Sequence, residues 1–415
     1  MKIWIKYLIG AIAGVILGNT FTSFFADPAV SETGTRIILG TRIILGIGKY
    51  TFFPLILFAV AFSVSKLMTE HLLFKVFLKV VLFTALSSLI LTLVGGGAAL
   101  LVFQGRIPII SEGAVSLSLP TLAQHIAMIF PDNFFAIFTA TGNYLMPMLV
   151  LAILIGINMD PSNLHTRPVI LIFDSIARIF FDINSLIIEF MALGIVFLSA
   201  TMTASLIANP QLELYKYLLI TVGCATLFVI FILIPAVMIL CCRRGKPFQS
   251  LYGLLAPAMA AFFSGDVYFG ATTLIKSSFE NIGAKRKVGA PVIAFLTVFS
   301  RGGTAMVSAA SIIIIIKSYT GIEIIWQDFF LIMLHTFLLS FILGAVPGMG
   351  TAISITMLCN GYGHGIENGY LIIQPVAGLL ISFSVLVDIT VMGFISTVIA
   401  QQTDLRKEIS IVKFT

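Results

Sequence analysis

The chain has few charged residues. Lys, Arg, Asp and Glu make up 10% of its 415 residues, whereas hydrophobic residues make up 59%. An average soluble domain carries about 25% charged residues, so this composition cannot cover a water-facing surface. The apolar residues run in blocks rather than alternating, which excludes an outer-membrane barrel. The sequence predicts an all-α polytopic membrane protein, and its length allows roughly eight to twelve spans.

Residues for metal binding and catalysis are also scarce. The four cysteines form no C-x-x-C pair and have no histidine partner at zinc spacing. There is no phosphate-binding loop, which excludes a single-chain primary pump. Paired acids or a His-x-x-x-His motif, which an intramembrane enzyme would need, are missing as well. We therefore expect no enzyme activity, no metal site and no cofactor.

The basic residues gather in short gaps between the apolar blocks and give a net charge of +6. The positive-inside rule places such gaps in the cytoplasm, which explains the charge without a nucleic-acid partner. Lys2 and Lys6 precede an apolar run that lacks a small-residue cleavage site, so we expect this run to stay as the first span. The pattern predicts a multi-pass protein of the plasma (bacterial inner) membrane with both termini cytoplasmic. The clusters are Lys2 and Lys6; Lys66, Lys75 and Lys79; Arg243, Arg244 and Lys246; Lys285, Arg286 and Lys287; and Arg406 and Lys407.

The apolar blocks change character along the chain. Most early blocks read as ordinary tilted helices, and in block 168–207 we expect Arg178 to pair with Asp182 at i,i+4 spacing. Two later segments are interrupted: 250–280 by Ser264-Gly265-Asp266, and 327–360 by a run from Gly344 to Thr351. Broken helices survive at membrane depth only inside protein or beside a water-filled cavity. Two such segments in corresponding places point to the binding site of a transporter.

Charge counting supports a hairpin at 250–280. The gaps on both sides, Arg243–Lys246 and Lys285–Lys287, are strongly basic, so both should be cytoplasmic. A single crossing would put them on opposite sides of the membrane. A re-entrant hairpin keeps both on one side.

Several motifs together resemble the dicarboxylate/amino acid:cation symporter family, the glutamate transporter homologues. Thr51-Phe52-Phe53-Pro54-Leu55 is similar to a proline-leucine motif of the family, and Pro131-Asp132-Asn133 to its Pro-x-Asn motif. Val346-Pro347-Gly348-Met349-Gly350-Thr351 is similar to the Val-Pro-Gly-Ala-Gly-Thr tip of its second hairpin. The resemblance covers essentially the whole chain.

The resemblance implies about eight transmembrane helices plus two re-entrant helical hairpins in an elevator-type architecture. Residues 1–248 would form a scaffold that trimerises, and residues 249–415 a moving transport unit. That unit would contain hairpin 1 (250–280), the seventh span (288–316), hairpin 2 (327–360) and the eighth span (370–402). The hairpin tips would serve as gates, and the family suggests Na⁺ or H⁺ as coupling ion.

The sequence departs from the family at its ligand positions. Ser300-Arg301-Gly302-Gly303-Thr304 stands where the family has Asn-Met-Asp-Gly-Thr, so the Asn and Asp that bind sodium are lost. The last span keeps one charge between Ser382 and Thr397, Asp388, and lacks the arginine that grips a side-chain carboxylate. Ser87 and Ser88 fall where the family offers hydroxyls to sodium, but Thr84 replaces a nearby tyrosine.

Three charged residues lie in the segments expected to face the cavity: Asp266, Arg301 and Asp388. Charges at membrane depth cost at least about 2.5 kcal/mol each and are functional by default. We expect Arg301 to pair with Asp388 or Asp266, and to replace a coupling ion by a fixed charge because a guanidinium is always charged. An alternative is that Arg301 belongs to a merely structural pair. A further scheme has Asp388 or Asp266 carry a proton.

The function predicted is secondary active transport, a symporter of a small solute, with an amino acid or dicarboxylate as the substrate implied by the resemblance. Proton coupling, or none, is open because the sodium sites look degraded. The alternative is an anion channel or non-transporting receptor on the same scaffold. The predicted substrate-binding residues are Asp266, Gly270, Arg301, Thr304, Val346, Pro347, Gly348, Gly350 and Asp388, and the predicted cation-coupling residues are Ser87, Ser88, Ser300, Ser340 and Asp388.

Overall fold

The computed structural model describes residues 2–20, 22, 32–101, 127–131, 133, 135–139, 144–242, 246–319, 324–345, 348–363, 366, 369–407, 409 and 414. Within these ranges the chain is helical and has no strand; one isolated bridge joins Ala284 to Arg406. Seven stretches are long and apolar enough to cross a membrane. The predicted all-α class and polytopic character are therefore confirmed at this level.

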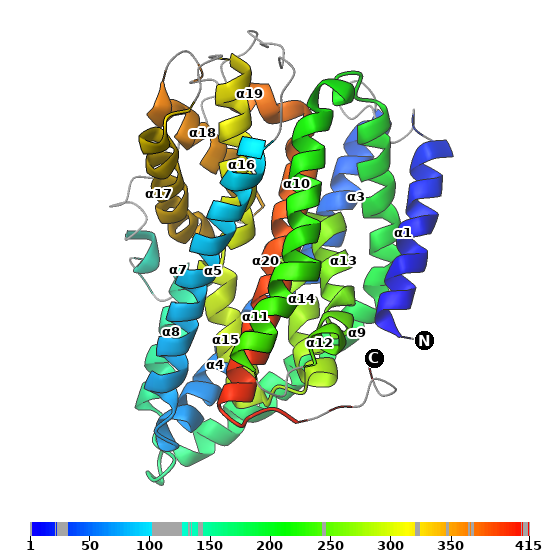
Figure 1. Cartoon of the computed structure of the whole chain (residues 1–415). Coiled ribbons are helices and arrows are strands. Elements are labelled where there is room, and N and C mark those ends of the chain that lie inside the picture. The colour runs from blue at the N-terminus through cyan, green and yellow to red at the C-terminus, as the bar shows by residue number, and fades with distance from the viewer. Residues whose placement is uncertain are drawn as a thin grey trace.

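The first half forms long helices that stand side by side in Figure 1. They are α1 (Ile3–Thr20), α3 (Glu32–Lys49), α4 (Phe52–Thr69), α5 (Leu73–Leu101), α8 (Met146–Asn158), α9 (Arg167–Ile207), α10 (Lys216–Phe228) and α11 (Ile234–Cys241), with a four-residue turn of helix, α7 (Ala136–Thr139), before α8. The single helix predicted for block 168–207 is confirmed by α9. Its ion pair is different: Arg178 Nη2 lies 2.9 Å from Asp174 Oδ2. Asp174 and Asp182 are each four residues from Arg178. A helical ion pair is more favourable when the acid precedes the base in the chain, as Asp174 does.

Helix α1 packs closely along α9 through a stripe of glycines, Gly10, Gly14 and Gly18. A Cβ atom on Gly14 would lie 2.2 Å from the carbonyl oxygen of Val196. Small residues are what let two membrane helices approach this far.

We expect Gly14→Val to destabilise the protein by about 1–3 kcal/mol, because the added atoms must push two backbones apart. The measurement is thermal unfolding of the purified protein in detergent. Gly97→Val in α5 is the matched control, since a Cβ atom there meets nothing within 4 Å. Equal unfolding temperatures for the two variants would contradict the close packing.

The second half contains shorter helices wrapped around α20 (Ala377–Gln402). They are α12 (Pro247–Gly253), α13 (Leu255–Ser264), α14 (Val267–Ser277), α15 (Arg286–Phe299), α16 (Gly302–Tyr319), α17 (Trp326–Ile342), α18 (Gly350–Tyr362) and α19 (Gly369–Ile373). Most residues of α15, α16 and α20 are buried. In the span of residues 286–318, 94% of an 18-residue apolar stretch is buried. The corresponding share is 33–39% in the spans of the first half. The second half is therefore the protein-enclosed part of the chain.

Helices α13 and α14 form a hairpin. Gly265 has a left-handed φ of 59° and ends α13, and Asp266 begins α14 as its N-cap. Asn281, just beyond α14, donates a hydrogen bond to the carbonyl of Gly253, just before α13. The segment thus returns to where it began, and its re-entry into a membrane stays a prediction.

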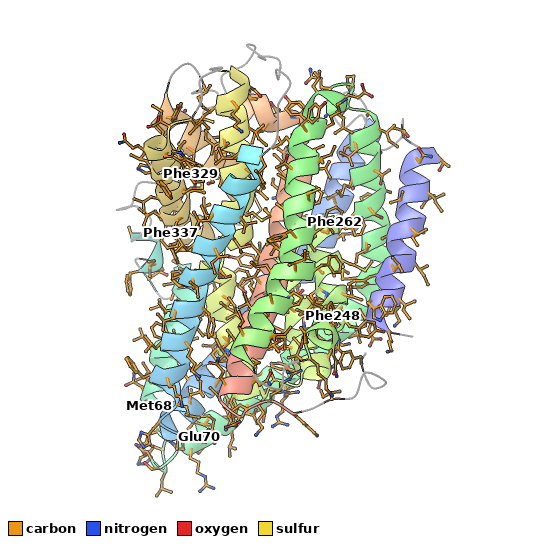
Figure 2. All side chains as sticks on the ribbon, in the orientation of Figure 1. Met68, Glu70, Phe248, Phe262, Phe329 and Phe337 are labelled. Carbon is orange, nitrogen blue, oxygen red and sulfur yellow. The ribbon has the colours of Figure 1, made fainter. Side chains whose placement is uncertain are left out.

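The two ends of the bundle differ. Helix α1 begins and α20 ends at the lower end in Figure 1, and α18 and α19 lie at the upper end. Met68 and Glu70, where α4 ends, also lie at the lower end in Figure 2. Lys287, at the start of α15, pairs there with Glu70 at 2.6 Å. The basic residues at the start of α15, the start of α1 and the end of α20 therefore lie at the same end of the molecule.

Candidate functional site

The site is built around a break between α15 and α16. Ser300 and Arg301 are not helical, and Gly302 and Gly303 restart the chain as α16. A Cβ atom on Gly303 would lie 2.4 Å from the carbonyl oxygen of Ser384 in α20. The glycines therefore let the start of α16 lie directly against α20.

Asp388 of α20 caps the start of α16. Its side chain is fully buried, and Oδ1 accepts hydrogen bonds from the backbone N–H groups of Gly303 (2.6 Å) and Thr304 (3.4 Å). The Thr304 hydroxyl donates to Oδ2 at 2.8 Å. A carboxylate at a helix N-terminus satisfies free N–H groups and interacts favourably with the helix dipole. Asp388 is thus an N-cap supplied by a neighbouring helix.

Arg301 is buried, with 3% of its surface exposed, and its Nε and Nη2 atoms have no hydrogen-bond partner among the described residues. These two nitrogens form one edge of the guanidinium, the edge that can donate two parallel hydrogen bonds to a carboxylate. The expected pairing of Arg301 with Asp388 or Asp266 was wrong: no ion pair within 4.0 Å joins Arg301 to either in the part of the chain that the structure describes.

Asp266 is occupied elsewhere. Its Oδ1 accepts hydrogen bonds from the N–H groups of Tyr268 and Phe269, and Oδ2 pairs with Lys49 Nζ at 3.0 Å. Lys49 ends α3 in the first half of the chain. The sequence analysis did not single out Lys49, because 217 residues separate it from Asp266 and no local pattern joins them.

Arg301 and Thr304 line a small cavity together with Val267 at the start of α14 and Gly350 at the start of α18. The cavity measures about 10 Å³, the space of roughly one water molecule. Of the predicted site residues, Arg301, Thr304, Gly348 and Gly350 lie together here, while Val346 and Pro347 lie outside the described residues. The lining residues absent from the predicted list are Val267, Leu343, Thr351, Ile381, Ser384 and Val385. Thr351 ends the quoted tip motif, whereas the other five carry neither a charge nor a motif that would have marked them.

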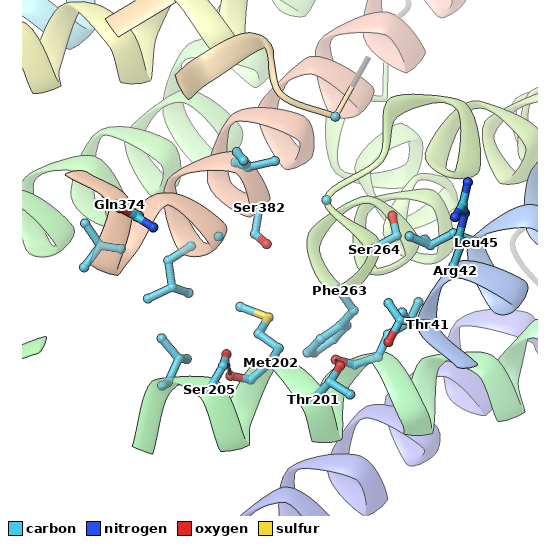
Figure 3. A pocket seen from close by; sticks show the side chains of 18 of the residues that line it. Thr41, Arg42, Leu45, Thr201, Met202, Ser205, Phe263, Ser264, Gln374 and Ser382 are labelled. Carbon is cyan, nitrogen blue, oxygen red and sulfur yellow. Dashed lines mark hydrogen bonds between the residues drawn. The ribbon is translucent and has the colours of Figure 1, made fainter. Parts of the chain in front are cut away.

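A much larger cavity of about 970 Å³ adjoins the small one, and Gly348 and Ile381 line both. Figure 3 shows Thr201 and Met202 of α9, Phe263 and Ser264 of the first hairpin, and Ser382 of α20 around it. Its charged lining residues among those described are Arg42 and Lys49, both cationic. A negatively charged solute would meet a favourable potential in this cavity.

Gly270 does not line either cavity. It is buried in α14, and a Cβ atom there would lie 2.7 Å from Cγ1 of Ile389 in α20. Gly270 therefore serves the packing of the first hairpin against α20.

The predicted cation-coupling serines fall into two groups. The hydroxyls of Ser87 and Ser340 donate to carbonyls of their own helices, those of Thr84 and Phe337. The buried hydroxyls of Ser88 and Ser300 have no partner among the described residues. Ser88 lies beside the helix break, because a Cβ atom on Gly302 would be 3.3 Å from its Cα.

Carboxylate, imidazole and thiol groups do not converge on a metal site in the described ranges: no three His, Cys, Asp or Glu residues are placed to hold one ion. Sodium prefers oxygen ligands, and Ser88 and Ser300 supply two hydroxyls near the break. Asp388 is a buried acid at the same break, and both of its carboxylate oxygens already accept hydrogen bonds from the start of α16.

Comparison with known proteins adds one finding. The profile of the Sodium:dicarboxylate symporter family matches residues 3–402. No curated protein matches the chain. The match covers both the long helices of the first half and the interrupted segments around Arg301. The chain therefore belongs to the sodium:dicarboxylate symporter family, whose members are transporters and not enzymes.

Proposed function

We propose that the protein is a symporter of a small carboxylate, an amino acid or a dicarboxylate, and that Arg301 binds the carboxylate. The observation that carries this proposal is a buried guanidinium that lines a cavity and whose Nε and Nη2 atoms have no hydrogen-bond partner among the described residues. A buried charge without a partner is strongly destabilising. A chain that keeps such a charge gains from it when an anionic ligand arrives.

Binding needs a movement of the second hairpin in this proposal. A cavity of about 10 Å³ is far below the roughly 300 Å³ or more of a ligand pocket. Gly348 has a left-handed φ of 84° and a Cβ atom there would meet nothing within 4 Å. The tip around Gly348 and Gly350 can therefore move toward the large cavity and admit a solute.

We propose an elevator-like movement of residues 249–415 against the scaffold of residues 1–248, in a trimer in the plasma (bacterial inner) membrane. The first hairpin contacts the scaffold through polar pairs that such a movement must break. Lys49 binds Asp266, the Asn184 amide donates to the carbonyl of Thr272, and the Lys276 ammonium pairs with Glu189 at 3.3 Å. In this proposal both hairpins are re-entrant and both termini cytoplasmic.

Transport is tested by uptake into liposomes that contain the purified protein. We expect saturable uptake of labelled succinate or aspartate, accelerated by unlabelled substrate inside the liposome. The alternative function, an anion channel or a non-transporting receptor, predicts a different result. A channel would give substrate-dependent currents without saturable exchange, and a receptor would bind the solute without uptake.

Sodium coupling is expected to be weak, because Arg301 brings a permanent cation to the place where an ion would sit. Replacing sodium by choline should change the Kd of the carboxylate by less than the roughly fivefold that marks weak coupling between two sites. The measurement is calorimetric binding in both salts at several pH values, because a proton is the other candidate coupling ion. An absolute sodium requirement would contradict this prediction and would point to Ser88 and Ser300 as ion ligands.

A further inference from the structure

The proposed function leaves open whether the substrate carries an ammonium group beside its carboxylate. Amino acids do and dicarboxylates do not. The hydrogen-bonding groups around the two cavities bear on this question, because a buried ammonium needs acceptors just as a buried carboxylate needs donors.

Donors for a carboxylate are present. The Nε and Nη2 groups of Arg301 have no hydrogen-bond partner among the described residues. They can donate to both oxygens of one carboxylate. The small cavity is also bounded by Gly350 and Thr351, the first two residues of α18. The first N–H groups of a helix have no partner within it and favour anions. A second carboxylate of a short diacid can be held there.

A counter-charge for an ammonium group is lacking among the described lining residues, although the large cavity offers neutral oxygen acceptors on Ser264, Gln374 and Ser382. Neither cavity has an acidic lining residue among those described, and the two tip residues outside the described ranges, Val346 and Pro347, are not acidic either. Asp388 and Asp266 line neither cavity, and their oxygens already accept from α16, from α14 and from Lys49.

The hydroxyl groups do not replace a carboxylate. Thr304 donates to Asp388, and Thr351 and Ser384 bond to each other at 2.7 Å, with Ser384 also in reach of the carbonyl of Ile381. Their remaining lone pairs are neutral acceptors. They suit a substrate hydroxyl, but they do not offset the charge of an ammonium group.

We propose that the site selects carboxylates that lack an ammonium group, such as short dicarboxylates and hydroxy acids, and rejects the corresponding amino acids. This inference rests on the proposed function, because it takes Arg301 as the carboxylate-binding group. Arg42, which lines the larger cavity, also disfavours an approaching ammonium group, whereas the charge of Lys49 is offset by Asp266.

The test compares ligands that differ at one substituent: succinate has a hydrogen atom where aspartate has an ammonium group, and lactate has a hydroxyl group where alanine has an ammonium group. Calorimetric binding to the purified full-length protein gives the Kd of each. We expect the ammonium-bearing member of each pair to bind at least roughly 100-fold more weakly, since its charge is buried without a counter-charge. A smaller ratio overturns the inference.

An Arg301→Gln arm separates this inference from the proposed function. If amino acids and their ammonium-free partners bind equally well to the wild type and both lose affinity in Arg301→Gln, only the selectivity is wrong. If succinate and lactate fail to bind, or bind equally well without Arg301, the proposed function falls together with the inference.

A second variant adds the missing counter-charge. Ser382 is buried and lines the large cavity beside Ile381, which lines both. We expect Ser382→Asp to lower the Kd ratio of aspartate to succinate at least tenfold, through one new counter-charge for the ammonium group. Ser382→Asn has nearly the same size without the charge and should leave that ratio unchanged. Equal ratios in the two variants overturn the inference.

Discussion

Arg301→Gln is expected to weaken binding of succinate, or of whichever carboxylate the wild type binds best, by roughly 30- to 4,000-fold. Truncating one partner of a buried, hydrogen-bonded charge pair costs about 2–5 kcal/mol of binding free energy. Glutamine keeps one NH2 group but neither the charge nor the edge formed by Nε and Nη2 that can bind both oxygens of a carboxylate. The measurement is the calorimetric Kd, and Arg301→Lys, which keeps the charge alone, should fall between the two.

The ligand-free protein should respond in the opposite direction. Because Nε and Nη2 are buried without a hydrogen-bond partner among the described residues, removing them relieves the cost of unsatisfied buried donors. We therefore expect Arg301→Gln to unfold in detergent at the same temperature as the wild type or above it. Its stabilisation by added carboxylate should be lost.

A surface arginine provides the control for this prediction. Arg178 on α9 is 62% exposed and pairs with Asp174, so Arg178→Gln should leave both the Kd and the unfolding temperature unchanged. If Arg301→Gln were strongly destabilised instead, Arg301 would hold the fold together, and its unpaired edge would not be a ligand site.

The interrupted segments of the second half could be predicted because their signals are local. Ser264-Gly265-Asp266 supplies a left-handed glycine and an N-cap aspartate, and these two residues end α13 and begin α14. The tip that contains Gly348 and Gly350 was recognised by its sequence. Arg301, Thr304 and Asp388 stood out as polar residues in apolar surroundings, and the structure brings all three to the start of α16.

The partners of the charged residues could not be predicted. Sequence spacing alone offers Arg301 both Asp266 and Asp388, and only the fold shows that each is satisfied elsewhere. The buried ammonium of Lys276 and its partner Glu189 are 87 residues apart, on different helices. Such pairs depend on how helices are placed in space, which periodicity does not encode.

The uncharged residues that line the small cavity could not be predicted from the sequence, for a different reason. Val267, Ser384 and Val385 belong to residue types that also fill ordinary helix interfaces. Their role follows from facing Arg301, and a sequence without a structure contains no sign of that. The charged residues of the site were therefore recognisable from the sequence, whereas the shape of the site was not.

Asp388→Ala is expected to destabilise the protein by about 3–5 kcal/mol, the cost of breaking a buried charged network by removing one partner. The N–H groups of Gly303 and Thr304 and the Thr304 hydroxyl would all lose their acceptor. The buried charge of Arg301 would also lose an acid with which it interacts electrostatically. Thermal unfolding of the ligand-free protein in detergent measures the effect.

Two further variants separate these contributions. Asp388→Asn keeps an oxygen for the two N–H groups, so its cost should be smaller and should come mainly from the lost charge. That cost should shrink again in the Arg301→Gln background, because the charge to be offset is gone; this is a double-mutant cycle. Asp174→Ala removes an acid whose partner Arg178 is 62% exposed and should cost about 1 kcal/mol or less. If Asp388→Ala unfolded at the wild-type temperature, Asp388 would not hold the start of α16, and the site would need another explanation for the position of Arg301.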